Sequence, residues 1–389
     1  MITRLKLTNF TSFGEFEIDF SPKINVIIGE NGSGKTQLLK AAYGLCAGAL
    51  TYKRLPDATR KELAVELTEK LVRLFMPLDE GLGRLRRNSA SSPAELHAHF
   101  ASGAEISCSF GVRSKIMKVK EDALYRKEHG GAVFVPTKEV LSLVKGIMDP
   151  THDQRTVELI FDAGYVDLAQ ALMREGTDDP TARLNQDPRF ATIVPRLINL
   201  IGGRYRLENG GFCFQAGEYI DKAPPEGTSS QAGQAYKDTT LQFLPAKAQS
   251  LSSGMTAEGF RKIGILHRLL SNGTLDPGHS GPLLWDEPES NLNPLLMKQV
   301  VEILFELSRN GQQVILATHD YVLLKWFDLL MDKGQGDHVR FHGLYRDSGH
   351  DGIMVRSVDD YNLVGRSAIS DVFAELYDED VKRALGGVE

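Results

Sequence analysis

The stretch that decides the fold of this 389-residue chain is residues 24–41, INVIIGENGSGKTQLLKA. The mostly apolar run at 24–28 predicts a buried β-strand, and the apolar spacing after residue 36 predicts a helix. The segment between them, GENGSGKT at 29–36, fits the pattern GxxxxGK[ST] at every fixed position. Because a glycine-rich turn before a helix N-terminus points backbone N–H groups inward, it is suited to holding phosphate oxygens. The alternative is a glycine-rich turn with a chance lysine.

The residue types in this loop predict a nucleoside triphosphate with its magnesium ion, that is, ATP and Mg²⁺. A lysine at position 35 can reach the β- and γ-phosphates, and the hydroxyl of Thr36 can ligate Mg²⁺. The residues that we expect to bind the nucleotide here are Gly29, Asn31, Gly32, Ser33, Gly34, Lys35 and Thr36.

A second chemical motif lies 250 residues later, at 282–289, and reads PLLWDEPE. A short apolar strand there delivers two adjacent carboxylates to its C-terminal end. We expect Asp286 to hold Mg²⁺, and Glu287 to orient or deprotonate the water that attacks the γ-phosphate. The alternative is an ordinary strand that ends in a charged turn.

Three further segments carry a family resemblance when taken in order. LSSGM at 251–255, SNLNP at 290–294 and VILATHD at 314–320 resemble the signature motif, D-loop and switch histidine of ABC-class ATPases, with the carboxylates as Walker B. The residues of these motifs are most similar to those of the SMC-like, RecF/OLD-type branch of this class. Within that branch, the chain resembles stand-alone ATPases without a Toprim domain. The resemblance covers residues 1–45 and 240–325 closely.

The resemblance implies a mechanism with two heads that bind ATP between them, head to tail. Ser252 and Gly254 would contact the γ-phosphate held by the partner head, with a helix starting near Met255 pointing its N-terminus at that phosphate. His319 would act with Glu287 and Lys35 in catalysis by sensing the γ-phosphate. The alternatives are a serine-rich helix cap for the first segment and a structural role for the histidine.

The chain also departs from the family pattern. Met255 replaces the usual glutamine of the signature, and Ser253 replaces its first glycine. No clear Q-loop glutamine follows the apolar strand at 133–135, where Thr137 and Glu139 are the two candidates to stand in for it. These departures predict an enzyme that binds ATP and hydrolyses it slowly.

The predicted fold class is α/β: an ABC-type P-loop ATPase head with a mixed central sheet, an antiparallel β subdomain and an inserted helical lobe. We expect residues 1–136 and 240–389 to form one discontinuous head, because the phosphate loop and the carboxylates belong to one site. Residues 137–239 would form a mostly helical inserted lobe with a flexible loop at 223–238.

Several elements can be placed from their patterns. Asp57 is a good N-cap for a helix whose leucines repeat on one face, and the alternation at about 84–120 predicts antiparallel strands. Paired glycines at 202–203 and 210–211 frame a predicted hairpin.

Composition limits the classes of function. The 45 basic and 51 acidic residues give a net charge of −6, which excludes a strongly basic nucleic-acid coat protein. The three cysteines form no cluster, which indicates a reducing compartment. No apolar N-terminal stretch and no membrane-length apolar run occur, so we expect a cytoplasmic protein without a membrane partner. A cluster of Arg84, Arg86 and Arg87 is interpreted as a solvated face.

The function that these features favour is an ATP-binding and hydrolysing molecular switch. It would form a homodimer or higher oligomer through the ATP sandwich and control a protein effector, such as a nuclease, in anti-phage defence or a toxin–antitoxin-like module. A RecF-like, DNA-binding ATPase of DNA repair is the first alternative and leaves nucleic acid open as a partner. A transporter subunit is the second, and the long insert and missing glutamine argue against it.

Overall fold

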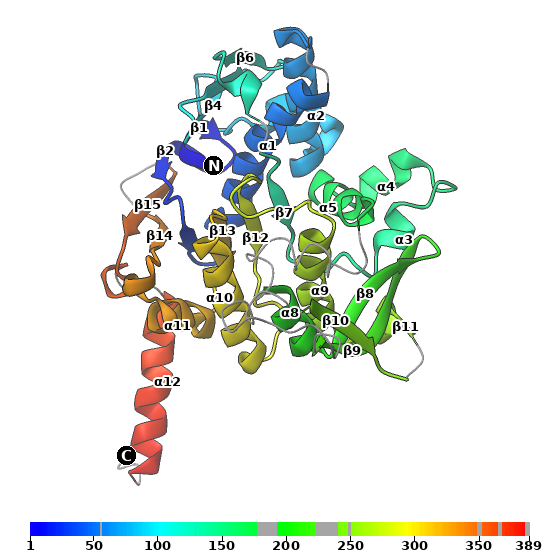
Figure 1. Ribbon diagram of the computed structural model, residues 1–389. Coiled ribbons are helices and arrows are strands. Elements are labelled where there is room, and N and C mark those ends of the chain that lie inside the picture. Colours follow the sequence, from blue (N-terminus) through cyan, green and yellow to red (C-terminus); the bar gives the residue numbers. More distant parts are fainter. Residues whose placement is uncertain are drawn as a thin grey trace. The chain divides into compact units, whose positions relative to one another are not determined.

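The computed structural model (Figure 1) describes residues 1–54, 57–128, 130–176, 193–222, 240–247, 250–347, 352–364 and 368–385. The chain divides into two compact units. The first comprises residues 1–137, 162–164 and 279–389, and the second comprises 138–161 and 165–278. The predicted loop at 223–238 lies outside the described residues.

A six-stranded mixed sheet forms the centre of the first unit, in the order β15-β14-β3-β13-β12-β7. The five strands from β14 to β7 run parallel, and β15 joins the edge antiparallel. Every residue of β3, β12 and β13 is buried, as in a parallel sheet covered on both faces. The strands are β3 (Ile24–Ile28), β7 (Val133–Val135), β12 (Leu283–Asp286), β13 (Val314–Thr318), β14 (Val339–Arg346) and β15 (Ile353–Val358).

A second, antiparallel sheet of the first unit has the order β2-β1-β4-β5-β6. Its strands alternate buried and solvent-facing side chains, and the buried ones pack against helices α1 (Lys35–Arg54) and α2 (Arg60–Phe75). The strands are β1 (Ile2–Phe10), β2 (Phe13–Asp19), β4 (Ala94–Phe100), β5 (Glu105–Phe110) and β6 (Lys118–Glu121). The mixed sheet, the antiparallel sheet and the helices confirm the predicted fold class.

The start of α2 corrects one prediction. The N-cap is Thr59, not Asp57, because Thr59 forms a complete capping box with Glu62. The Glu62 backbone N–H donates to the Thr59 hydroxyl, and the Glu62 carboxylate accepts from the Thr59 backbone N–H. The predicted leucine face is confirmed, since Leu63 and Leu71 are fully buried.

Two further helices of the first unit follow the loops after β12 and β13. Asn293 caps α10 (Pro294–Arg309), and Asp320 caps α11 (Tyr321–Leu330). The last helix is α12 (Ala368–Ala384). Short 3₁₀ turns lie at η1 (Leu78–Glu80), η2 (Leu82–Leu85), η3 (Tyr125–Lys127), η5 (Lys333–Gln335) and η6 (Tyr361–Leu363).

The second unit combines helices with a small antiparallel sheet. The hairpin of β8 (Gly203–Glu208) and β9 (Gly211–Lys222) turns at Asn209 and Gly210, both with positive φ, which confirms the predicted hairpin. The remaining strands are β10 (Thr240–Pro245) and β11 (Leu251–Ser252). The helices are α3 (Val144–Ile147), α4 (Gln154–Ile160), α5 (Ala163–Met173), α8 (Ile193–Ile201) and α9 (Glu258–Ser271), with the 3₁₀ turn η4 (Ser253–Met255) before α9.

The two compact units and the predicted domains divide the chain differently. Residues 240–278, which we expected in the ATPase head, group with the second unit by their packing. The division into a head at 1–136 and 240–389 and a lobe at 137–239 stays a prediction. In the described ranges, no helix has both the length and the apolar composition needed to cross a membrane.

Candidate nucleotide site

Four loops that are far apart in the sequence meet at one edge of the central sheet. Strands β3, β13, β12 and β7 are parallel neighbours, so their C-terminal ends share this edge. Gly29, His319 and Glu287 directly follow the first three strands, and Thr137 is the second residue after β7. Ligands of open α/β sheets bind outside the C-terminal ends of the strands. The sheet therefore gathers the predicted phosphate loop and the predicted carboxylates of the first unit.

The phosphate loop needs glycine at three positions, two because of their backbone conformation and one because of a close contact. Gly32 and Gly34 have φ angles of 79° and 87°, which other residues rarely adopt. At Gly29, an added Cβ would lie 2.5 Å from Ser33 Oγ and 2.9 Å from the Leu344 carbonyl oxygen. Ser33 Oγ is itself buried and has no hydrogen-bond partner among the described residues. The loop is thus closely folded, with a hydroxyl left for a further polar group, while Asn31 is exposed.

Lys35 is folded over the phosphate loop. Its side chain is buried, and its Nζ donates to the carbonyl oxygens of Gly29 at 2.7 Å and Glu30 at 3.0 Å. Burial lowers the pKa of Lys35, and the nearby carboxylates, Glu287 first, oppose that effect. The ammonium therefore lies at the loop where phosphate oxygens are expected.

Asp286 binds two hydroxyl groups through a single carboxylate oxygen. Its Oδ2 accepts from Thr36 Oγ1 at 2.8 Å and from Thr137 Oγ1 at 3.0 Å. Its Oδ1 is buried and has no hydrogen-bond partner within the described ranges. Burial raises the pKa of Asp286, while the hydroxyls of Thr36 and Thr137 lower it. Because a buried, unpaired carboxylate oxygen is costly, and because Mg²⁺ prefers oxygen ligands from one or two carboxylates, this donor set fits Mg²⁺.

Thr137 is a residue that sequence reasoning left undecided. The pattern after β7 offered Thr137 and Glu139 as stand-ins for the Q-loop glutamine. The structure brings the Thr137 hydroxyl to Asp286, whereas Glu139 lies in the second unit and forms an ion pair of 2.8 Å with Arg261. Both residues follow the end of a parallel strand, which was the signal in the sequence. A difference of two positions along the chain gives them different partners.

Glu287 and His319 lie together at the same edge. His319 Nδ1 is 3.1 Å from Glu287 Oε1, and the Glu287 backbone N–H donates to the Ala317 carbonyl at 2.9 Å. Glu287 has a φ of 48°, which is unusual for a non-glycine residue and holds the turn after β12. The histidine and the second carboxylate are therefore paired by two neighbouring strands.

Glu289 is a residue of the site that sequence reasoning missed. Its buried Oε1 accepts from Thr318 Oγ1 at 2.6 Å and from the His319 backbone N–H at 3.3 Å. Burial raises the pKa of Glu289, and the bond from Thr318 lowers it. From the sequence, Glu289 reads as one more charged residue of a turn, and no spacing marked it as a partner of the strand end at 318–319.

The signature segment belongs to the second unit. Ser252 ends β11 and Gly254 lies in η4, and both are exposed. The helix that follows begins at Glu258, so the prediction of a start near Met255 is wrong. The physical reason is a closed 3₁₀ turn, in which Thr256 donates through its backbone N–H and its hydroxyl to the Ser253 carbonyl, at 3.1 and 2.7 Å. The contact of Ser252 and Gly254 with a nucleotide stays a prediction.

A glycine-rich loop between a buried parallel strand and a helix, facing a hydroxyl-bound aspartate on a strand two places away, defines the class of P-loop nucleotide-binding proteins. Two family models match parts of the chain. Residues 4–69 match the family model described as "AAA domain". Residues 226–325 match the model described as "AAA domain, putative AbiEii toxin, Type IV TA system".

Curated relatives match the chain over part of its length. The DNA replication and repair protein RecF of Bacillus mycoides is 31% identical over 147 residues, which are 37% of this chain and 33% of that protein. The DNA double-strand break repair Rad50 ATPase of Thermoplasma volcanium is 26% identical over 211 residues, 52% of this chain and 22% of that protein. The chain thus spans about a third or less of these relatives. The matched segments are therefore similar to AAA-domain, RecF and Rad50 proteins, which supports the predicted resemblance to SMC/RecF-like ABC-type P-loop ATPases.

Solved structures of SMC heads align with this chain at low sequence identity. The head of an SMC protein bound to the C-winged helix domain of ScpA aligns with a TM-score of 0.49 at 15% identity, over 92% of this chain and 97% of that one. The SMC head domain from Thermotoga maritima aligns with a TM-score of 0.45 at 14% identity, over 92% and 98%.

Proposed function

We propose that this chain is an ATP-driven switch that binds ATP with Mg²⁺, pairs head to tail with a second copy, hydrolyses the nucleotide slowly and controls a protein effector. The observation that carries the proposal is the arrangement at Asp286. One of its oxygens holds Thr36 and Thr137, and the other is buried without a partner in the described part of the chain. A metal ion that bridges to phosphate would satisfy that oxygen.

Binding of the triphosphate would replace hydrogen bonds from Lys35 to backbone carbonyls with stronger bonds to phosphate oxygens. The Lys35 ammonium donates to the carbonyls of Gly29 and Glu30, and phosphate oxygens are stronger, charged acceptors. The first N–H groups of α1 point toward the same loop and favour an anion. Mg²⁺ held by Thr36 and Asp286 would offset the charge of the β- and γ-phosphates.

Hydrolysis would depend on Glu287. Its carboxylate can orient a water molecule and take its proton, and His319, at 3.1 Å, can sense the γ-phosphate on the same side. Glu289 would act as a positioning residue, because it binds the backbone of His319 and the hydroxyl of Thr318. The pair of Glu287 and His319 would thus be held in place before the nucleotide arrives.

Dimerisation would bring in the signature segment. Ser252 and Gly254 are exposed. Apart from the two chain neighbours of Gly254, no described residue comes within 4 Å of where a Gly254 Cβ would be. This segment is therefore accessible to the nucleotide of a second copy. Met255 and Ser253 replace the family's usual residues here, which supports slow turnover.

An effector role is supported by the second family model, whose description names a putative toxin of a toxin–antitoxin system and which covers residues 226–325. We infer that ATP binding and release control such a partner in a defence or toxin–antitoxin-like module. The test is affinity purification from the native host with and without ATP, followed by mass spectrometry. A protein retained by the wild-type chain and lost with Lys35→Ala supports the proposal. Equal recovery of every partner with both chains contradicts it.

DNA binding is the second candidate function, favoured by the names of the RecF and Rad50 relatives. The cluster at 84–87 gives it little support, because Arg86 donates to the carbonyls of Ala90 and Ser92, and Arg87 donates to that of Ser12. A duplex-binding ATPase would lose affinity steeply as salt rises, through counterion release. Fluorescence anisotropy with duplex DNA between about 50 and 200 mM salt measures this dependence. A steep fall in affinity over this range supports the DNA-binding function, and absent or salt-insensitive binding contradicts it.

A further inference from the structure

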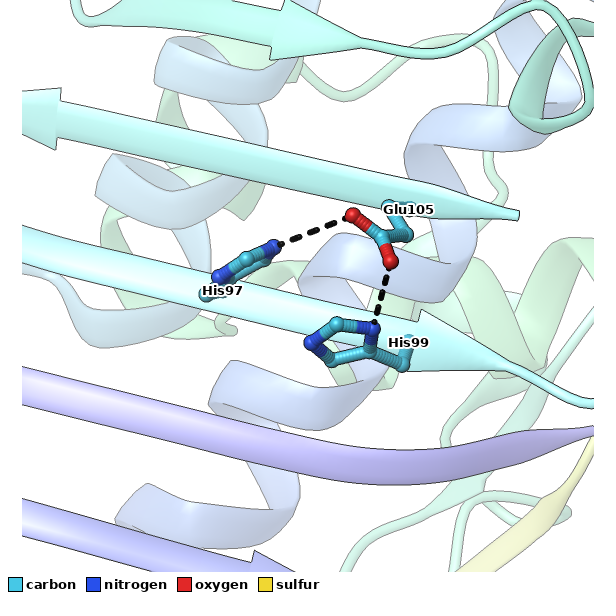
Figure 2. A group of neighbouring side chains, drawn as sticks. All are labelled: His97, His99 and Glu105. Atoms are coloured by element: carbon cyan, nitrogen blue, oxygen red, sulfur yellow. Dashed lines mark ion pairs between the residues drawn. The ribbon is translucent and has the colours of Figure 1, made fainter. Parts of the chain in front are cut away.

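Two histidines and a glutamate form a cluster on the antiparallel sheet of the first unit (Figure 2). The nucleotide site, in contrast, lies at an edge of the mixed sheet. His97 and His99 lie two residues apart on β4, so both point to the same face. Glu105 lies directly opposite His99 on β5. The residues between the histidines and on either side, such as Leu96 and Ala98, are fully buried on the other face.

The cluster is compact. His99 Nδ1 lies 3.0 Å from Glu105 Oε1, and His97 Nε2 lies 3.9 Å from Glu105 Oε2. Figure 2 shows that each ring directs one nitrogen at a different oxygen of the same carboxylate. The centroids of the two imidazole rings are 4.5 Å apart, and the ring planes are inclined by 32° to each other. One ligand atom from each of the three side chains lies within 4.8 Å of the other two.

We propose that His97, His99 and Glu105 bind a transition-metal ion of the Zn²⁺ class, with solvent completing its coordination. Imidazole nitrogens and a carboxylate oxygen bind Zn²⁺ at about 2.0–2.2 Å, so tetrahedral ligands lie about 3.3 Å apart. The three side chains reach that spacing by movements of about 1.5 Å or less at their tips. Mg²⁺ prefers an all-oxygen shell and is a poor match for two imidazoles.

The surroundings allow an ion to enter and do not carry a large excess of positive charge. The side chains of His97, His99 and Glu105 are 38%, 33% and 52% exposed, so water and ions reach them. The neighbouring strand β1 places Arg4 and Lys6 opposite the two histidines. Arg4 forms ion pairs with Asp19 at 2.5 Å and Glu17 at 3.3 Å, which offset its charge.

The ion would have a structural effect, because it would link β4 to β5 on the face opposite the buried side chains. Binding only to the folded chain would raise its stability in proportion to the logarithm of the free metal concentration. The competing explanation is a pair of histidine–glutamate ion pairs that hold no metal.

The first experiment is a Zn²⁺ titration of the metal-free full chain in competition with a chromophoric chelator. Excess Mg²⁺ is present throughout, to saturate the carboxylates of the nucleotide site. We expect one Zn²⁺ per chain at this cluster. His99→Ala and Glu105→Gln should each weaken that binding by about tenfold or more, because each removes one of three ligands. His152→Ala, an exposed histidine elsewhere in the chain, is the matched control and should leave the affinity unchanged.

A second measurement keeps the result independent of folding defects. Co²⁺ in place of Zn²⁺ should give the visible absorption of a site with nitrogen ligands in the wild-type chain, and the spectrum should change in Glu105→Gln, which keeps the size and polarity of the side chain. Thermal melting without metal should be the same for wild type and Glu105→Gln, whereas Zn²⁺ should raise the melting temperature of wild type more. Zn²⁺ affinity that is equal in wild type, His99→Ala and Glu105→Gln overturns the metal site and leaves the ion pairs.

Discussion

Thr137 Oγ1 donates a hydrogen bond to Asp286 Oδ2 at 3.0 Å, and the two residues are 149 positions apart in the sequence. The bond joins the end of β7 to the end of β12, which are neighbouring parallel strands. Thr36 donates to the same oxygen from the start of α1. Two hydroxyl groups therefore orient the carboxylate that we expect to hold Mg²⁺, and its other oxygen is the one that we expect to bind the ion.

Replacement of Thr137 tests this orientation. Thr137→Val keeps the shape of the side chain and removes the donor, so Asp286 should lose about 1.5–3 kcal/mol of hydrogen bonding to a charged group. We expect Mg²⁺-dependent ATP hydrolysis to fall by about tenfold or more, with a higher Mg²⁺ requirement. Thr137→Ser keeps the hydroxyl and is the control. Equal loss in the Val and Ser variants would show that packing, not the hydrogen bond, is responsible.

Glu287→Gln tests the proposed general base. Gln keeps the size of the side chain and cannot take a proton, so phosphate release should slow by about 100-fold or more while ATP binding is retained. ATP should then accumulate between paired chains, and light scattering should detect a dimer that persists after excess nucleotide is removed. Glu69→Gln, exposed on α2, is the matched control. Wild-type turnover in Glu287→Gln would remove this residue from the proposed mechanism.

Lys35→Ala tests the phosphate loop. The substitution removes the buried ammonium that donates to Gly29 and Glu30, so the triphosphate loses its main cation. We expect ATP to raise the melting temperature of the wild-type chain and to leave that of Lys35→Ala unchanged. The melting temperature without ATP shows whether the variant folds. An ATP-dependent shift of wild-type size in a folded Lys35→Ala chain would contradict the assignment.

The sequence predicts the parts of this fold that depend on local patterns. The buried strand at 24–28, the phosphate loop and the leucine face of α2 follow from residue spacing, and all are present in the structure. The missed features depend on which side chains the folded backbone brings together. Glu289 meets Thr318 across two loops, 29 residues apart in the sequence. His99 and Glu105 are close in the sequence, but they meet only because the register of β4 and β5 places them opposite each other. The predicted start of a helix also shifts when a second residue nearby can act as its N-cap, as Thr59 does in place of Asp57 at the start of α2.

Buried His342 predicts a pH dependence of stability. His342 lies on β14, next to Asn25 at 3.2 Å and Ser357 at 2.8 Å, and burial lowers its pKa to about 3. The unfolded chain takes up this proton near pH 6.5, whereas the folded chain does so only near pH 3. Between these values the unfolded state binds more protons, so stability is complete above pH 6.5 and falls as the pH decreases.

His342→Gln removes this titration while keeping a side chain that can bond Asn25 and Ser357. Urea unfolding at pH 7.5 and 5.5 measures the effect. The free energy of unfolding should fall by about 1.4 kcal/mol more in the wild-type chain than in His342→Gln over this interval. Because both chains share every other titrating group, the difference isolates His342. His152→Gln, at an exposed position, should behave as wild type. The same acid sensitivity in His342→Gln and wild type would mean that His342 does not remain neutral in the folded chain.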